Sequence, residues 1–301
     1  MVRPDVKTIA EQVRCGAILV SDGAWGTQLQ ARGLRPGECP ELWCADRPAD
    51  ILAVARSYLD AGAVLVKSNS FGGTRFKFDL YGLAARTAEL NEKAAALARE
   101  AAGPDRHVLG SVGPTGKILL TGEVTEEQLY EAFREQVTAL ERGGADVCLI
   151  ETQSDLAEAR LAIRAAREHT RMEVACTFTF EPTAAGNFRT MMGLTPTDAA
   201  RGAAEAGAHL IGTNCGTGFA GMIAVVRDLR AAVANLPIVV HANAGRPQLQ
   251  DGQTVFPESP EFVAARVPDL VRTGAAVVGG CCGTTPAHIA AIAEAVRKLA
   301  R

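Results

Sequence analysis

The chain has 301 residues, of which 48% are hydrophobic and 22% are charged, and its formal net charge is −3. This composition predicts a sizeable buried core and gives no reason to expect a nucleic-acid or membrane partner. No stretch holds 18 uninterrupted apolar residues, and the N-terminus lacks the apolar core of a secretory signal. We therefore expect a cytoplasmic protein whose eight cysteines are thiols rather than a disulfide scaffold.

Short apolar or β-branched runs alternate along the chain with longer, alanine-rich amphipathic runs. The runs predicted as strands are 17–23, 63–71, 107–112, 146–152, 173–180, 209–215, 237–243 and 276–282. The helices predicted between and after them are 49–61, 82–102, 125–143, 154–169, 196–206, 219–234, 259–273 and 285–300. Ser154 and Thr197 are expected to cap two of these helices.

Eight successive strand–helix units predict a (β/α)8 TIM barrel, formed as a single domain over residues 1–301. The nearly continuous apolar strands fit a parallel sheet that is covered by helices. A doubly wound open sheet is the competing architecture for the same alternation. The barrel is favoured because eight units are present and because the length is near the ~250 residues usual for that fold.

Polar residues and cysteines gather where the predicted strands end, which is where the active sites of such barrels lie. In chain order these residues are Asp22, Gly23, Glu151, Asn214, Cys215, Asn243, Cys281 and Cys282. The barrel would bring the ends of the sixth and eighth strands, and with them three of the eight cysteines, close together at its mouth.

Three thiolates at one place suit Zn²⁺, and three protein ligands with an open fourth position are typical of a catalytic zinc. Cys281 and Cys282 cannot both point inward from a regular strand, but the glycines of "GGCCG" at 279–283 permit an irregular turn. The residues alone leave an alternative open. Cys215 would then be a small core residue, and the adjacent pair an accident or a redox site.

Motifs along nearly the whole chain resemble the homocysteine S-methyltransferase family, and most of all the homocysteine-binding barrel of cobalamin-dependent methionine synthase. They are "DGAWGTQL" (22–29), "SNSFGGTRFKFDLYGL" (68–83), "GSVGPTG" (110–116), "IETQSD" (150–155), "GTNCG" (212–216), "HANAGRPQ" (241–248) and "GGCCGTTPAHI" (279–289). The resemblance implies a TIM barrel that holds one Zn²⁺ through Cys215, Cys281 and Cys282. It also makes Asn243 a candidate for the fourth position when substrate is absent.

The substrate that the resemblance implies, homocysteine, carries an ammonium and a carboxylate. Asp22 and Glu151 are natural partners for the ammonium, and the matching acids of the resembled family have this role. Gly23 and the turn that contains Asn214 offer backbone N–H groups to the carboxylate. From the residues alone, Asp22 could equally be a turn residue and Glu151 an acid at a helix start.

No motif of the sequence identifies the methyl donor. One barrel is expected to use the whole chain, so the donor would be a free sulfonium or betaine, or methylcobalamin on another domain or a corrinoid carrier protein. The resemblance favours the corrinoid donor. Another thiol could replace homocysteine, and a non-catalytic thiol- or zinc-binding subunit is the alternative from a different class.

Two histidines and two glycine-containing loops invite other readings. His241 is expected to be a packed barrel residue, and His288, inside the last helix, to be structural or solvent-facing. The "NSFGG" and "GPTG" loops do not match GxxxxGK[ST], so nucleotide binding is not expected.

Overall fold

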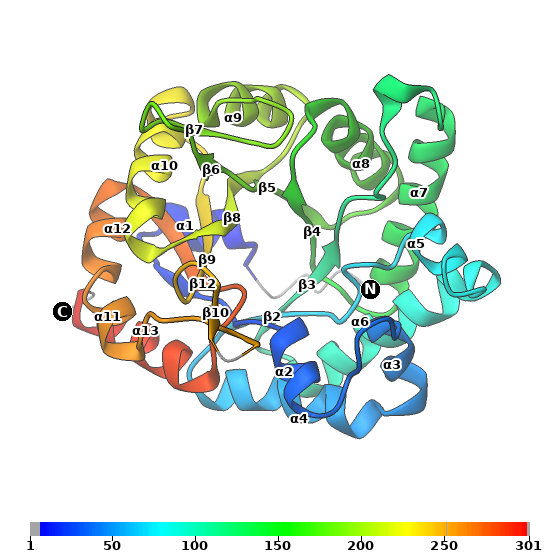
Figure 1. Cartoon of the computed structure of the whole chain (residues 1–301), viewed down its shortest axis with the longest axis horizontal. Coiled ribbons are helices and arrows are strands. Elements are labelled where there is room, and N and C mark those ends of the chain that lie inside the picture. The colour runs from blue at the N-terminus through cyan, green and yellow to red at the C-terminus, as the bar shows by residue number, and fades with distance from the viewer. Residues whose placement is uncertain (1–6, 251, 300–301) are drawn as a thin grey trace.

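The computed structural model describes residues 7–250 and 252–299. Its main sheet has eight strands, all paired in parallel, in the order β1-β12-β9-β8-β5-β4-β3-β2. A parallel bridge from Ser21 to Leu65 joins the two edges of this sheet. Figure 1 shows the strands at the centre of the molecule with the helices around them. The predicted TIM barrel is confirmed, and the open doubly wound sheet is excluded because its edges would not meet.

Each predicted strand run overlaps one strand of the barrel, and β4, β8 and β12 extend one to three residues beyond their runs. The bounds of the strands are β1 Leu19–Val20, β2 Leu65–Lys67, β3 His107–Val112, β4 Val147–Gln153, β5 Glu173–Phe178, β8 Leu210–Gly218, β9 Ile238–Asn243 and β12 Ala275–Gly280. Every residue of β3, β9 and β12 is buried. The apolar runs are continuous because a parallel barrel strand is covered on both of its faces.

The helices outside the barrel follow the predicted runs, with two differences. Their bounds are α4 Pro48–Asp60, α6 Thr87–Ala102, α7 Glu126–Arg142, α8 Leu156–His169, α9 Pro196–Glu205, α10 Phe219–Ala232, α11 Pro260–Ala264, α12 Val267–Thr273 and α13 Pro286–Leu299. The run 82–102 starts with a separate 3-10 turn at Ala84–Arg86. The run 259–273 is two helices, because Pro268 lacks an N–H group and lies in the first turn of α12.

Both predicted helix caps are wrong by one or two positions. Asp155, not Ser154, caps α8, since its side chain accepts a hydrogen bond of 2.8 Å from the Ala157 N–H. Thr195 caps α9 and accepts from the Asp198 N–H at 3.1 Å. Pro196 fills the first position of α9 and places Thr197 inside the helix.

Several short elements were not predicted, because they are too short for a hydrophobic period to show. They are α1 Ile9–Arg14, α2 Gly26–Ala31, η1 Pro40–Leu42, α3 Trp43–Asp46, α5 Arg75–Asp79, η3 Leu119–Thr121, and the hairpins β6–β7 (Glu181–Pro182, Phe188–Arg189) and β10–β11 (Gln248–Gln250, Gln253–Val255). Apart from α1, all of them lie in connections that follow barrel strands. In the described part of the chain, no helix has the length and hydrophobicity to cross a membrane.

The core has two layers, because side chains alternate across each strand. One layer, which includes Val66, fills the space between strands and helices. The other, which includes Leu65, groups residues of all eight strands with Ile9 of α1. Helix α1 covers the amino end of the barrel, where the Glu173 carboxylate accepts hydrogen bonds from the N–H groups of Ile9 and Ala10 at 2.6 and 3.1 Å. Access to the barrel interior is therefore from the carboxyl end.

Candidate active site

Three cysteines meet at the carboxyl end of the barrel. The Sγ atoms of Cys215, in β8, and of Cys281 and Cys282, directly after β12, lie within 4.8 Å of one another. All three are free thiols and half-buried. Within residues 7–250 and 252–299 they form the one group of three His, Cys, Asp or Glu side chains with metal-ligand spacing. The fold thus supplies a soft, compact set of three sulfur donors.

The backbone of β8 is distorted at its cysteine. Cys215 has φ +59° and is followed by Gly216 at φ +69°. Among the described residues other than glycine, only Thr152 shares this left-handed conformation, with φ +63°. Such a conformation costs a non-glycine residue about 1–2 kcal/mol, and strain of this kind gathers at functional sites. Both residues lie near the carboxyl ends of barrel strands.

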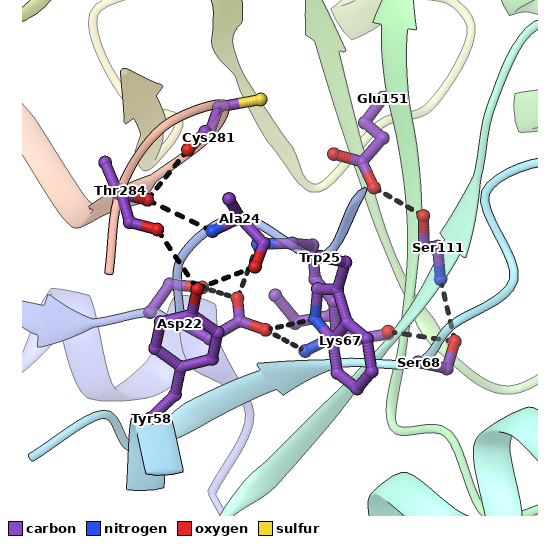
Figure 2. Close-up of polar contacts among 12 residues, drawn as sticks. Asp22, Ala24, Trp25, Tyr58, Lys67, Ser68, Ser111, Glu151, Cys281 and Thr284 are labelled. Atoms are coloured by element: carbon purple, nitrogen blue, oxygen red, sulfur yellow. Dashed lines mark hydrogen bonds and ion pairs between the residues drawn. The ribbon is translucent and has the colours of Figure 1, made fainter. Parts of the chain in front are cut away.

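The turn at Cys281 and Cys282 is held by hydrogen bonds on both sides. The Cys281 N–H donates to the Ala242 carbonyl at 2.7 Å, and the Cys281 carbonyl accepts from the Thr284 hydroxyl at 2.7 Å. That hydroxyl also accepts from the Ala24 N–H at 3.0 Å, as Figure 2 shows. A Cβ atom on Gly280 would lie 2.2 Å from the Thr284 hydroxyl oxygen, so this turn requires glycine. The irregular turn expected from "GGCCG" is present.

The three thiols share their protons unequally. Hydrogen bonds from Cys281 and Cys282 lower the pKa of the Cys215 thiol to about 2. The same contacts raise the pKa of Cys282 to about 11 and that of Cys281 well above its usual range. The shifts run in opposite directions because the three sulfurs interact strongly and titrate as one group.

Neighbouring polar groups of β9 differ in their relation to the cysteines. The Asn243 side chain forms a hydrogen bond with Cys215, and its Oδ1 is buried without a partner among the described residues. His241 is fully buried, and burial holds its pKa well below the usual range, so the ring is neutral.

His288 is a buried structural residue, since its Nδ1 contacts the Thr285 hydroxyl and its Nε2 the Glu258 carbonyl.

Glu151 brings a carboxylate to the same place. It lies in β4, is 6% exposed, and accepts a hydrogen bond from the Ser111 hydroxyl. Burial raises its pKa, and the charge of Lys67 partly opposes that shift. Figure 2 shows the Glu151 carboxylate and the Cys281 sulfur projecting into the space between their strands.

Asp22 is placed differently from the expectation that it meets the substrate directly. Its side chain is 0% exposed, and its Oδ1 lies 2.5 Å from Lys67 Nζ. Its Oδ2 accepts from the Lys67 N–H at 2.8 Å and from the Trp25 indole N–H at 2.9 Å. The carboxylate is therefore already paired (Figure 2). Lys67 was not among the predicted site residues, although a lysine inside the apolar run "AVLVKSNSF" at 63–71 indicates a buried charge that needs a partner.

The Asn214 side chain is also hydrogen-bonded to other residues of the chain. It is 0% exposed, and its Oδ1 accepts from the Thr152 N–H at 2.8 Å and the Thr177 hydroxyl at 2.7 Å. Its Nδ2 donates to the Thr152 hydroxyl at 2.8 Å. The Asn214 side chain therefore holds Thr152 in its left-handed conformation, and the prediction that this turn offers backbone N–H groups to a carboxylate stays a prediction.

A cavity of about 270 Å³ opens beside the cysteines. Its walls include the three cysteines, Gly23, Lys67, Ser111, Glu151 and Thr152, whereas Asp22, Asn214 and Asn243 are not among the lining residues. Ligand pockets start near ~300 Å³, so this cavity suits a small molecule. A Cβ on Gly23 would lie 2.7 Å from the Tyr58 ring, so glycine lets the first βα loop pack closely here.

The chain matches a known protein family and curated relatives. The family model described as "Homocysteine S-methyltransferase" matches residues 19–296. Methionine synthase of Mycobacterium tuberculosis is 35% identical over 298 residues, which cover 94% of this chain and 25% of that protein. Methionine synthase of Mycobacterium leprae is 33% identical over 309 aligned positions, with 97% and 25% covered. The chain thus spans about a quarter of the length of these relatives.

A solved structure shares the whole fold. The metallated form of the homocysteine methyltransferase MmuM from Escherichia coli superimposes with a TM-score of 0.78 at 28% identity, covering 95% of this chain and 99% of that one. Its oxidized form gives a TM-score of 0.76 at 28% identity, with the same coverage.

Proposed function

The chain belongs to the homocysteine S-methyltransferase family, and from this premise we propose that it is a zinc-dependent enzyme that methylates the thiol of homocysteine to give methionine. The observation that carries the proposal is the meeting of Cys215, Cys281 and Cys282 at the wall of a small cavity that also contains Glu151. A sulfur-rich end and a carboxylate in one cavity fit a thiol that carries an ammonium group.

The residues present fit a zinc ion. The three sulfurs are free and close enough to exchange hydrogen bonds, which is the donor type and number of a catalytic zinc site. Cys215, Cys281 and Cys282 would hold the metal, with the unpartnered Oδ1 of Asn243 as a candidate for the fourth position. A free thiol has a pKa near 8.5, and a bound zinc would supply the acceptor sulfur as its thiolate at neutral pH.

The chain's own residues bind and orient the acceptor. We propose that Glu151 accepts the ammonium group, because its carboxylate lines the cavity and has the Ser111 hydroxyl as one partner. The surrounding loops exclude water from the acceptor sulfur. In the transfer a new S–C bond forms, the bond between the methyl group and the donor breaks, and the donor leaves with that electron pair. The thiol proton would be released to solvent when the thiol binds a zinc held by the three cysteines.

The donor that we propose is a methylated corrinoid, carried by another domain or by a carrier protein that docks at the carboxyl end of the barrel. The motif resemblance to cobalamin-dependent methionine synthase supports this choice. So do the curated relatives named methionine synthase, of which this chain matches about a quarter. The same site could use a sulfonium or betaine donor with unchanged sulfur chemistry.

The test measures methionine formed by the purified, zinc-loaded chain from homocysteine and equal concentrations of methylcobalamin, betaine or S-methylmethionine. We expect slow turnover with free methylcobalamin, because the chain positions only one of the two reactants. Rapid turnover with a small donor and none with methylcobalamin would overturn the corrinoid proposal alone. Homocysteine binding without turnover on any donor or docked corrinoid carrier would indicate a non-catalytic subunit.

A further inference from the structure

We infer that Lys67 is the carboxylate receptor of the acceptor cavity. With Asp22 holding it in place, Lys67 selects thiols that carry a carboxylate, so the acceptor is an amino-acid thiol bound between Lys67 and Glu151. The inference rests on the proposed function, since it places the acceptor sulfur at the three cysteines.

Lys67 lies at the end of β2, between Asp22 and the cavity. It is 6% exposed and lines the cavity, whereas Asp22 is 0% exposed and does not. Two bonds from Lys67, one from its main-chain N–H and one from Nζ, end on the two oxygens of the Asp22 carboxylate. A ligand in the cavity therefore meets the cation of this pair and not the anion.

The ammonium group of Lys67 has donors to spare. A lysine ammonium carries three N–H groups. Within the described ranges 7–250 and 252–299, Asp22 is the hydrogen-bond acceptor found for Nζ, and it takes one of them. Burial opposes the charge on Lys67, but the carboxylates of Asp22 and Glu151 outweigh that effect and raise its pKa. Lys67 is thus a charged group with unused donors at the border of a ligand cavity.

Glu151 supplies the opposite charge on the same cavity. Lys67 and Glu151 carry opposite charges and line the same cavity, so the charge of Glu151 raises the pKa of Lys67 and that of Lys67 lowers the pKa of Glu151. They do not form a direct ion pair in the part of the chain that the structure describes. Asp22 neutralises the charge of Lys67 but takes only one of its three ammonium N–H groups. The cavity is therefore lined by an ammonium group with unused donors and by the Glu151 carboxylate. A zwitterionic amino acid satisfies both, with its carboxylate at Lys67 and its ammonium at Glu151.

Other acceptors leave one of these groups without a partner. A thiol with an ammonium but no carboxylate leaves the free N–H groups of Lys67 desolvated, and a thiol with a carboxylate but no ammonium does the same to Glu151. An unpaired buried charged group costs binding free energy. The pair therefore sets specificity, and Asp22 acts as a positioning residue that fixes the ammonium of Lys67.

The test compares three thiols by titration calorimetry on the zinc-loaded chain. They are homocysteine, 3-aminopropane-1-thiol, which lacks the carboxylate, and 4-sulfanylbutanoate, which lacks the ammonium. In the wild type we expect homocysteine to bind about 10- to 150-fold more tightly than either analogue. In Lys67→Met the advantage over 3-aminopropane-1-thiol should disappear, while affinity for that analogue changes less than about threefold.

Glu151→Gln is the matched control, because it removes the opposite charge from the same cavity. It should keep the preference for a carboxylate and lose the preference for an ammonium. Lys67→Met leaves Asp22 without its cation, so the double variant Lys67→Met/Asp22→Asn, which removes both charges, is measured beside it and should show the same loss of carboxylate preference. Zinc content reports that the cysteine site of each variant is intact.

The outcomes separate the two proposals. If every thiol binds the zinc-loaded wild type but Lys67→Met weakens all three equally, or none, Lys67 is only the counterion of Asp22 and the inference fails alone. If the wild type binds no zinc, or no thiol in its presence, the proposed function fails and the inference fails with it.

Discussion

The two ends of the barrel are built from the same strands but differ in whether their buried polar groups have hydrogen-bond partners. At the amino end, Glu173 accepts hydrogen bonds from the start of α1, and the Asp146 carboxylate accepts from the Val108 N–H at 2.8 Å. At the carboxyl end, His241, Asn243 and Gln153 have buried polar atoms without partners among the described residues.

Backbone strain follows the same division. Among the described residues other than glycine, the two with positive φ, Thr152 and Cys215, both lie near the carboxyl ends of their strands. Buried polar groups are normally paired, so an end that concentrates strain and unpaired atoms has been shaped for something other than stability. Helix α1 closes the amino end of the barrel, and the carboxyl end carries the cavity beside the cysteines.

Removal of one of the three sulfurs should have the largest effect on the function of the carboxyl end. Cys282→Ser should lose the bound zinc and abolish methionine formation, because a catalytic zinc site takes three protein ligands and only Cys215 and Cys281 would remain. The free energy of unfolding of the metal-free protein should change by less than about 1 kcal/mol, since the substitution is nearly isosteric and removes little packing. Metal analysis, the methionine assay and urea unfolding with a chelator check the three parts. A large loss of metal-free stability would show that the cysteines are core residues.

Displacement of the cysteine turn should have the next largest effect. Gly280→Ala would put a Cβ atom 2.2 Å from the Thr284 hydroxyl oxygen and push away the group that bonds the Cys281 carbonyl. We expect zinc affinity to fall about 10- to 100-fold, as for other residues that orient metal ligands. Gly26→Ala is the matched control, since a Cβ on Gly26 meets nothing within 4 Å. Equal zinc affinity in both variants, measured by chelator competition, would contradict the role given to the turn.

The Glu151 carboxylate predicts a pH effect on homocysteine binding. Its pKa is raised above the usual 4.5, so protonation begins at a higher pH than for an exposed glutamate. The protonated form cannot pair with an ammonium, so the wild-type advantage over Glu151→Gln should be about 10- to 150-fold at neutral pH and should vanish as pH falls through this pKa. Proton release from the thiol affects both proteins alike, so the ratio of their affinities is the measurement. A ratio that is independent of pH would place the ammonium elsewhere.

A change at the amino end should have the smallest effect on activity. Glu173→Ala removes the acceptor of two N–H groups at the start of α1, and the free energy of unfolding should fall by about 1–3 kcal/mol. Methyl transfer at temperatures well below the unfolding transition should stay at the wild-type rate. Glu205→Ala, which breaks only an exposed pair with Arg160, should leave stability unchanged. A loss of activity in folded Glu173→Ala would mean that the two ends of the barrel are coupled.

The sequence by itself determined the barrel and the meeting of its cysteines. Parallel strands that are buried on both faces leave continuous apolar runs, which can be counted, and the carboxyl end of each run marks one edge of the barrel. Cys215, Cys281 and Cys282 were located in this way. The bound zinc, and the roles of Glu151 and Asn243 toward it and the substrate, stay predictions.

The tertiary structure alone decided which polar groups remain for a ligand. Asp22 was expected to meet the ammonium of the substrate, but Lys67 on the neighbouring strand pairs with its carboxylate. The Asn214 side chain, whose turn was expected to offer backbone N–H groups, is bonded to the left-handed Thr152 on β4. The physical reason is that a strand's apolar pattern records only that it is buried. The partner of a buried carboxylate or amide depends on the register between strands distant in sequence and on the backbone angles at their ends, and neither leaves a local signature in the chain.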